Sequence, residues 1–433
     1  GAVSSHSLAA EHYLPRTVDG ELDELFTGAA AISLEGAKGV GKSATAAERA
    51  TRTFLMEDPA VREAVAAAPE LLRGTGPVLI DEWQHLPMTW DVVRRAVDAG
   101  AAPGQFLLTG SASSFSPGNH SGAGRILKVR MRPLSLAERG LSFPTVSLAA
   151  ILTGTQPDMS GETSVGLPEY VEEICGSGFP GIRGLPQRVR RAQLRGYVDR
   201  VVDRDMVEAG LRVRKEAALR RWMAAYAAAT SSVASYEKIR DAATPGEGNK
   251  PARSTTEPYR NMLERLFILD PLPAWQPTQS HLRQLAAAPK HHLTDPALAT
   301  TLLGLAPASL LHGDQGPVPR PQDGSLLGAL FESLVTLGVR TYAQRAEASV
   351  GHLRTHRGDH EVDLIVERDD GRIVAIETKL ATTVSQDDTV HLRWLRDRLG
   401  DDLLDAVVVT SGRYAYSRPE DGVAVVPAAL LGP

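Results

Sequence analysis

Gly36-Ala-Lys-Gly-Val-Gly41-Lys42-Ser43 is the stretch that decides the fold of the first part of this chain, because it fits the pattern G-x-x-x-x-G-K-[ST] at every position. It follows the apolar, strand-like run Ala29–Leu34 and opens the helical run Lys42–Arg49. Glycines let the backbone curl until its N–H groups face a phosphate, and a helix N-terminus adds partial positive charge. The pattern therefore predicts a nucleotide-binding loop between a strand and a helix.

The side chains of this loop indicate how a nucleotide and its cation would be held. Lys42 would reach the β and γ phosphates of ATP, and Ser43 would offer its hydroxyl to Mg²⁺. The residues expected to contact the nucleotide are Gly36, Ala37, Lys38, Gly39, Val40, Gly41, Lys42, Ser43 and Ala44.

A second apolar run, Val78–Asp81, ends in the acid pair Asp81-Glu82. Ligands of α/β proteins bind at the carboxyl ends of the strands, so this pair is expected beside the loop. Asp81 would hold Mg²⁺ through water, and Glu82 would polarise the attacking water as general base. Because both acids are present, the sequence predicts hydrolysis of ATP in addition to binding.

Two further polar positions are candidates for the same site. Phe106–Thr109 reads as a strand, and the hydroxyl of Thr109 at its end can sense the γ-phosphate or position water. Arg125 lies in a glycine-rich segment and can serve as an arginine finger toward a neighbouring subunit, which would make the protein a homo-oligomer. A plain surface arginine is the alternative at that position.

The first part of the chain resembles bacterial and archaeal AAA-type P-loop ATPases in which the core is followed by a domain of unknown function. The segments that carry this resemblance, besides the loop, are Tyr13-Leu-Pro-Arg16, Leu79-Ile-Asp-Glu-Trp83, Leu108-Thr-Gly-Ser111, Arg132-Pro-Leu-Ser-Leu136, Gly178-Phe-Pro-Gly-Ile-Arg183 and Tyr197-Val-Asp-Arg200. The resemblance implies an ATPase core and defines fold better than biological role.

The middle of the chain is basic and helical. From Gly181 to Arg221 there are 12 Arg and Lys residues against 5 Asp and Glu. Such a segment is either a solvated helical face or a surface for nucleic-acid phosphates. Three predicted helices follow, Ala217–Ala229, Tyr236–Ala242 and one capped by Thr255 or Thr256 that runs to Leu266, with a wing strand at Phe267–Leu269. This order indicates a winged helix-turn-helix that reads DNA, or a plain packing module.

Four polar residues near the end of the chain form a second constellation. Glu332 lies in the helical run Leu326–Leu337, and Asp363 lies in the strand-like run Glu361–Glu367. Glu377-Thr-Lys379 closes the strand-like run Ile373-Val-Ala-Ile. Acids gather a divalent metal, and a lysine steadies the hydroxide or the developing phosphorane charge. The arrangement resembles the PD-(D/E)xK nuclease fold, which implies Glu332, Asp363 and Glu377 as ligands of Mg²⁺ or Mn²⁺, and Asp363, Glu377 and Lys379 as catalytic residues. Surface ion pairs, or a nuclease-like fold that only binds, are the alternatives.

The expected fold class is α/β. Strands are predicted at Ala29–Leu34, Thr51–Met56, Val78–Asp81, Phe106–Thr109 and Ile126–Met131, and helices at Lys42–Arg49 and Trp90–Ala99. Later strands are predicted at Ala406–Val409 and Val423–Val426. Alternation of strands and helices favours a parallel sheet with both faces covered. The predicted parts are an AAA-type P-loop ATPase core (1–150), a helical basic lid or linker (151–215), a winged helix-turn-helix (216–275) and a C-terminal α/β restriction-endonuclease-like domain (276–433).

Composition excludes several classes of protein. The single cysteine, Cys175, rules out an internal disulfide framework and favours a reducing, cytoplasmic setting. No apolar run is long enough to cross a bilayer, so no membrane partner is expected. A net charge of −5 argues against a wholly basic nucleic-acid coat protein but leaves room for a local basic patch.

Three functional hypotheses follow. In the first, ATP drives a DNA-acting enzyme whose C-terminal domain cuts phosphodiesters. In the second, ATP controls a regulatory switch or DNA-binding protein whose nuclease-like domain is not catalytic. In the third, the protein remodels other proteins, and a polypeptide rather than DNA stimulates its ATPase activity.

Overall fold

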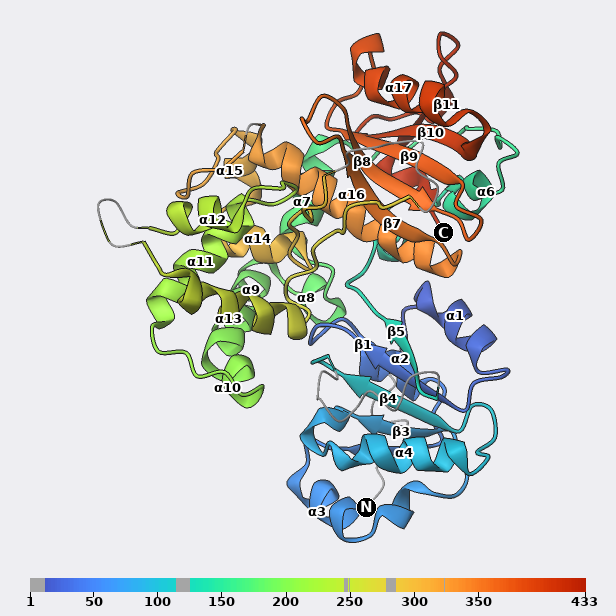
Figure 1. Cartoon of the computed structure of the whole chain (residues 1–433), viewed down its shortest axis with the longest axis vertical. Helices are drawn as coiled ribbons and strands as arrows, with labels where there is room; N and C mark the ends of the chain where they lie inside the picture. The colour runs from blue at the N-terminus through green and yellow to red at the C-terminus, as the bar shows by residue number, and fades with distance from the viewer. Residues whose placement is uncertain (1–11, 114–124, 245–247, 249, 278–285, 323) are drawn as a thin grey trace. The chain divides into compact units, whose positions relative to one another are not determined.

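The structure is a computed structural model that describes residues 12–113, 125–244, 248, 250–277, 286–322 and 324–433. The chain divides into two compact units (Figure 1). Unit 1 comprises residues up to Pro133 together with Leu263–Ile268, and unit 2 comprises Leu134–Met262 and Leu269–Pro433. No helix among the described residues is long and apolar enough to cross a membrane.

Unit 1 is built on a five-stranded sheet in the order β2-β3-β4-β1-β5, and every pairing is parallel. The strands are β1 Ala31–Glu35, β2 Arg52–Leu55, β3 Val78–Asp81, β4 Phe106–Gly110 and β5 Leu127–Arg130. The helices are α1 Val18–Leu25, α2 Lys42–Ala47, α3 Pro59–Ala67 and α4 Met88–Asp98, with short 3₁₀ turns at Pro69–Leu72 and Trp83–His85. The α/β class, the parallel sheet, its five strands and the two helices are confirmed to within two residues at each end.

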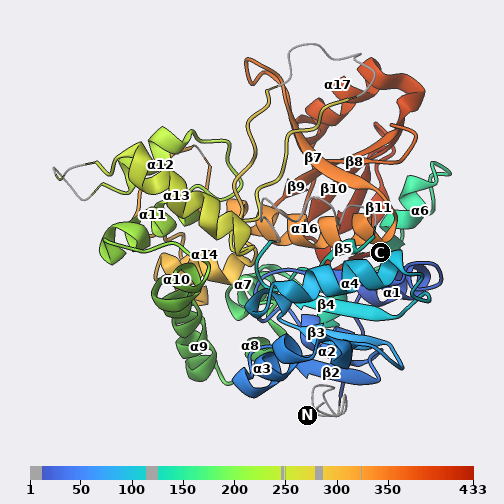
Figure 2. The same cartoon turned by 60° about the horizontal axis from the view of Figure 1, so that its bottom comes forward.

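The central strands of unit 1 are buried along their whole length because the sheet is covered on both faces. All residues of β1, β3 and β4 are buried. Helix α4 lies along β3 and β4 (Figure 2) and contributes Trp90 and Val93 to a core that also holds Trp83 and the strand residues Ile80 and Leu108. This core fixes the carboxyl ends of β1, β3 and β4 beside one another.

The first half of unit 2 is helical. Its helices are α5 Leu136–Arg139, α6 Leu148–Leu152, α7 Leu167–Gly176, α8 Pro180–Arg183, α9 Gln187–Arg200, α10 Met206–Glu208, α11 Glu216–Ala228, α12 Tyr236–Ala242, α13 Arg253–Arg265, α14 Pro296–Leu302 and α15 Pro307–Leu311, with a π-helical turn at Val201–Asp205 after α9. The apolar face predicted for α13 is confirmed, because Tyr259, Met262, Leu263 and Leu266 are all buried.

The predicted wing strand at Phe267–Leu269 is wrong. The chain turns after α13, and Phe267 has the left-handed φ of 61°, which a strand does not accommodate. Only Leu269 makes an isolated bridge, to Leu293. The three helices are therefore present without the strand that would have made them a winged module.

The second half of unit 2 contains a six-stranded mixed sheet in the order β11-β12-β10-β9-β8-β7. The strands are β7 Ser349–Arg354, β8 Glu361–Glu367, β9 Ile373–Lys379, β10 Leu403–Thr410, β11 Tyr416–Ser417 and β12 Ala424–Pro427. Helices α16 Leu326–Arg345 and α17 Val390–Leu399 both lie against it (Figure 1). Ile373 and Ala375 pack with Leu392 and Leu395 of α17, so the alternate residues of β9 face the opposite side.

The boundary at which the first predicted part ends, residue 150, lies inside helix α6, directly after a paired strand. Strand β6, Val146–Ser147, pairs with β13, Leu431–Gly432, near the C-terminus. Contacts of this kind place the residues from Leu134 onward in unit 2. The four-part division of the chain stays a prediction.

Candidate nucleotide site and C-terminal acid cluster

The loop from Gly36 to Ser43 has the backbone that the sequence pattern predicts. Gly39 and Gly41 adopt φ of 86° and 107°, which non-glycine residues rarely adopt. A Cβ on Gly36 would lie 2.1 Å from the carbonyl oxygen of Met131, so only glycine fits there. The loop leaves β1 and enters α2 at Lys42, which directs a helix N-terminus at the site.

The ammonium of Lys42 lies inside the turn formed by the Gly36–Ser43 loop. Its ammonium donates to the carbonyl oxygens of Gly36 at 2.6 Å and Ala37 at 2.9 Å, and to Ser111 Oγ at 3.3 Å. Burial lowers the pKa of Lys42 to about 8, against the opposing attraction of Glu82 and Asp81. A phosphate group in the loop would give this ammonium anionic acceptors.

The predicted magnesium ligands Ser43 and Asp81 meet between helix α2 and the end of strand β3. Ser43 Oγ donates to Asp81 Oδ1 at 2.5 Å, and Thr109 Oγ1 donates to the same oxygen at 2.9 Å. Burial raises the pKa of Asp81, and the hydrogen bond from Ser43 opposes this rise. A hydroxyl and a carboxylate are hard oxygen donors of the kind Mg²⁺ prefers, so the two residues fit that ion.

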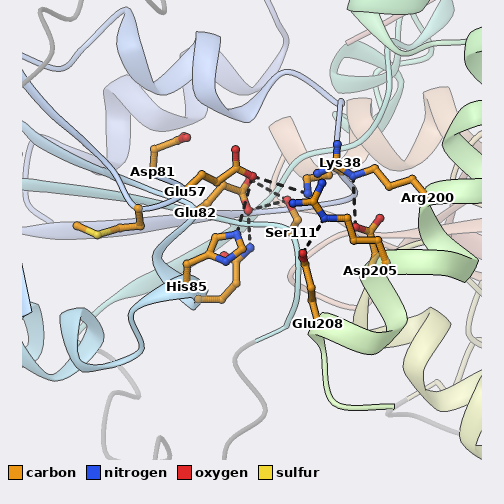
Figure 3. A network of polar contacts seen from close by, with 12 residues as sticks. Lys38, Glu57, Asp81, Glu82, His85, Ser111, Arg200, Asp205 and Glu208 are labelled. Carbon is orange, nitrogen blue, oxygen red and sulfur yellow. Dashed lines mark hydrogen bonds and ion pairs between the residues drawn. The ribbon is translucent and has the colours of Figure 1, made fainter. Parts of the chain in front are cut away.

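Glu82 is held in an unusual backbone conformation at the end of β3. Its φ and ψ are both 54°, the left-handed region that costs a non-glycine residue roughly 1–2 kcal/mol. Its amide donates to Thr109 Oγ1 at 2.9 Å, so Thr109 contacts both Glu82 and Asp81, and its predicted role toward the γ-phosphate or the water stays a prediction. Its carboxylate accepts from Ser111 Oγ at 2.8 and 3.0 Å (Figure 3). It also accepts from Gln84 Nε2.

Lys38 and Ala44 stand at the edges of the predicted contact set. Lys38 Nζ lies 3.7 Å from Glu57 Oε1, and His85 Nε2 lies 3.8 Å from the same oxygen (Figure 3). Ala44 is half-buried in the first turn of α2, where its amide is near the phosphate end of the helix.

Arg16 is a residue of this site that reasoning from catalytic motifs missed. It is buried, and its guanidinium donates to the carbonyl oxygen of Val40 at 2.6 Å and to that of Arg132 at 2.7 Å. Tyr13, three residues earlier, bonds Thr45 Oγ1 of α2 at 2.8 Å. The short segment before α1 thus holds the nucleotide-binding loop in place. The sequence feature that could have identified Arg16 is that Tyr13-Leu-Pro-Arg16 is one of the segments that carry the resemblance to AAA-type ATPases.

Arg125 lies away from the loop within its own chain. It precedes β5, at the amino end of a strand whose carboxyl end, Arg130, pairs with Glu35 before the loop. Its guanidinium Nε lies 2.6 Å from Asp98 Oδ1. A role as a finger toward a neighbouring subunit, and the oligomer it requires, stay predictions.

The acids predicted in the C-terminal part converge on one cavity of about 400 Å³. Glu332 comes from α16, Asp363 from β8, and Glu377 and Lys379 from β9, and all four line it. Asp363 Oδ2 accepts from the amide of Thr378 at 2.8 Å and from its hydroxyl at 3.1 Å.

A lysine that the sequence did not single out occupies the middle of this cluster. Lys290 Nζ lies 3.1 Å from Glu332 Oε2 and 3.5 Å from Asp363 Oδ1. Burial raises the pKa of Glu332 to about 8 and that of Glu377 well above its usual value, and the charge of Asp363 adds to both. Burial alone would lower the pKa of Lys290, but the charges of Glu332 and Asp363 raise it.

The predicted metal-ligand set Glu332, Asp363 and Glu377 lines the same cavity as Lys290, and its role as a metal centre stays a prediction. Across the described ranges, no group of three or more His, Cys, Asp or Glu side chains is placed so that it could hold a metal ion. Lys290 lies within ion-pair distance of both Glu332 and Asp363, so one positive charge is already present beside two of the acids. Lys379, the expected catalytic lysine, is ion-paired with Asp388 instead.

Family models match three regions of this chain. Residues 29–139 match the AAA domain family, residues 167–309 match a domain of unknown function (DUF8612), and residues 327–431 match another (DUF4143). Uncharacterized proteins of Mycobacterium bovis and Mycobacterium tuberculosis are each 27% identical over 395 residues, which cover 90% of this chain and 76% of theirs. A Walker-type ATPase of Pyrococcus abyssi aligns with a TM-score of 0.39 and 14% identity, over 68% of this chain and 97% of that one.

The match at residues 29–139, together with the loop and acid pair, identifies an AAA-type P-loop ATPase domain in this chain. The regions matched by DUF8612 and DUF4143 contain the helical part of unit 2 and the sheet with its acid cluster.

Proposed function

We propose that this protein hydrolyses ATP with Glu82 as general base and uses the cycle to act on DNA. The observation that carries the first half is the placement of the Glu82 carboxylate, which shares Ser111 Oγ with the Lys42 ammonium. A base must lie within reach of the water it activates, next to the groups that hold the phosphates. Lys42 would steady the phosphate oxygens, and Ser43 and Asp81 would hold the Mg²⁺ that offsets their charge.

The basic face of helix α9 supports the second half of the proposal. Arg188, Arg191 and Arg195 are exposed and follow one another at i, i+3 and i+7 over roughly 10 Å of the helix, beside the strip that holds the buried Leu194 and Val198. Within the described part of the chain, none of the three arginines has an acidic partner. The guanidinium groups of arginines without acidic partners are available to bind the phosphates of a nucleic-acid backbone.

A salt titration of DNA binding tests this surface. Each phosphate contact adds about 0.9 to the slope of log K against log salt, so changing Arg188, Arg191 and Arg195 to Gln should lower the slope by about 2.7. Fluorescence anisotropy with a labelled duplex measures it. The matched control changes Arg204, Arg253 and Arg413 to Gln, which removes the same charge from arginines already paired with acids.

Equal slopes for the two triple variants would remove α9 as the DNA surface. ATP turnover that rises with unfolded polypeptide and not with DNA would instead favour a protein remodeller. Turnover that disappears in Glu82→Gln while DNA binding persists would separate the two halves of the proposal.

Metal-dependent cleavage by Asp363, Glu377 and Lys379 is the competing candidate for the C-terminal part. It is favoured by Glu377 Oε1, which is buried without a hydrogen-bond partner among the described residues, because a cation would satisfy it. The ion pairs of Lys290 count against it. Plasmid cleavage with Mn²⁺ that disappears in Asp363→Ala would establish the nuclease, and uncut plasmid would favour a domain that binds without cutting.

A further inference from the structure

The acid cluster of unit 2 already contains a cation of its own. Lys290 Nζ lies between Glu332 and Asp363, and the three side chains are only 11%, 14% and 17% exposed, respectively. Buried carboxylates need a compensating charge or must take up protons. In a metal centre a divalent ion supplies that charge, and here a lysine ammonium does.

The backbone holds Lys290 in place on both sides. Its amide donates to the carbonyl oxygen of Leu272 at 2.9 Å, and its carbonyl oxygen accepts from the amide of Leu272 at 2.8 Å. The next residue, His291, donates its amide to Ser232 at 2.8 Å and accepts from the amide of Ser231 at 2.8 Å. The backbone that carries the ammonium is therefore hydrogen-bonded to two neighbouring segments.

The other lysine that lines the cavity, Lys379, has a different ion-pair partner. Lys379 pairs with Asp388, whose carboxylate also accepts from the amide of Ser385 at 2.7 Å and from its hydroxyl at 3.0 Å. The positive charge of Lys379 is thus paired with an acid outside the set Glu332, Asp363 and Glu377. The two lysines line the same cavity but have different partners, which makes Lys379 a matched control for Lys290.

We infer that Lys290 is a built-in counter-cation that takes the place of a divalent metal among Glu332, Asp363 and Glu377. A divalent ion bound to Glu332 and Asp363 would have to approach the ammonium closely or displace it, and like charges in a buried site repel strongly. The cluster is then an internal salt-bridged core, and Lys290 decides its cation selectivity. This inference concerns unit 2 and does not depend on ATP hydrolysis.

Titration of the full chain with MnCl₂ alone, without nucleotide, tests the inference. Isothermal calorimetry and the paramagnetic resonance signal of free Mn²⁺ report the number of bound ions. We expect Lys290→Met to gain one Mn²⁺ site at least tenfold tighter than any in the parent protein. The double variant Lys290→Met with Asp363→Asn should lose that site. Lys379→Met, which removes the same charge from the same cavity, should gain none.

Three results would overturn the inference. The first is Mn²⁺ binding by the parent protein that Asp363→Asn abolishes. The second is a folded Lys290→Met protein without a new site, and the third is an equal gain in Lys379→Met. If circular dichroism shows that Lys290→Met does not fold, Lys290→Gln keeps a polar side chain of similar length and replaces it in the same comparison. Any weak binding through Ser43 and Asp81 is common to all variants and is subtracted.

Discussion

Replacing Glu82 with Gln removes the proposed general base while preserving its shape. In the structure the carboxylate accepts two hydrogen-bond contacts from Ser111 Oγ and one from Gln84. The carbonyl oxygen of glutamine can keep the bond from Ser111, but the amide cannot take a proton from water. Both residues tolerate the left-handed backbone at this position equally, so the fold is expected to survive.

The expected size of the effect follows from the chemistry that is lost. General base catalysis contributes roughly 10²- to 10⁴-fold, which is about 3–5 kcal/mol of transition-state stabilisation at 1.36 kcal/mol per factor of ten. ATP affinity should stay within about threefold, because Lys42, Ser43 and Asp81 are unchanged and supply the ground-state contacts. The loss should therefore appear in kcat and leave binding nearly intact.

Phosphate release under saturating ATP measures kcat, and a fluorescent ATP analogue measures the Kd. Glu57→Gln is the control, since this acid pairs with Lys38 and His85 at the same end of the sheet but does not contact Ser111. It should change kcat by less than about threefold. A Glu82→Gln protein that keeps its turnover, or that loses ATP binding in parallel, would refute the assignment of Glu82 as the base.

The remaining predictions concern pH and stability. Because the pKa of Lys42 is lowered to about 8, ATP affinity should fall about tenfold or more between pH 7 and pH 9.5 as the ammonium loses its proton. The Lys42→Met variant should lack this pH dependence. Measurements of the Kd for ATP across that pH range test both expectations. Glu173 is paired with Arg139, whose side chain is fully buried, and with Arg183, so Glu173→Ala should cost about 3–5 kcal/mol in urea unfolding. Although burial opposes it, the bond from Arg183 and the charge of Arg139 hold the pKa of Glu173 below its usual value. Its contribution is therefore present above the unfolded-state pKa, near 4.3, and is lost as pH falls through the lower folded value; a parent protein that lost no more stability in acid than Glu173→Ala would contradict this.

Much of unit 1 could be predicted because its signals are local. The loop glycines are required by backbone angles that involve only neighbouring residues. Strand β3 is predicted from the short apolar run Val78–Asp81, whose four residues are buried in the structure. The meeting of Ser43 with Asp81 followed from one rule, that parallel strands present their carboxyl ends at the same edge. Local pattern also identified α12 and β8 at their observed bounds.

Other features were decided by contacts between residues far apart in the sequence. Arg16 donates hydrogen bonds to Val40 and Arg132. Lys290 forms ion pairs with Glu332 and Asp363. The sequence next to Arg16 or Lys290 does not predict these partners. The wing strand failed because a single left-handed residue, Phe267, turns a β-prone run away from extension.

The sequence by itself determined the nucleotide loop, its acid pair and the elements that bring them together, because backbone sterics and hydrophobic period act over a few residues. Only the tertiary structure decided which charge lies among the acids of unit 2. Several lysines along the chain carry equal charge, and burial beside particular carboxylates, which depends on how distant segments pack, selects Lys290 for the cluster and leaves Lys379 with Asp388.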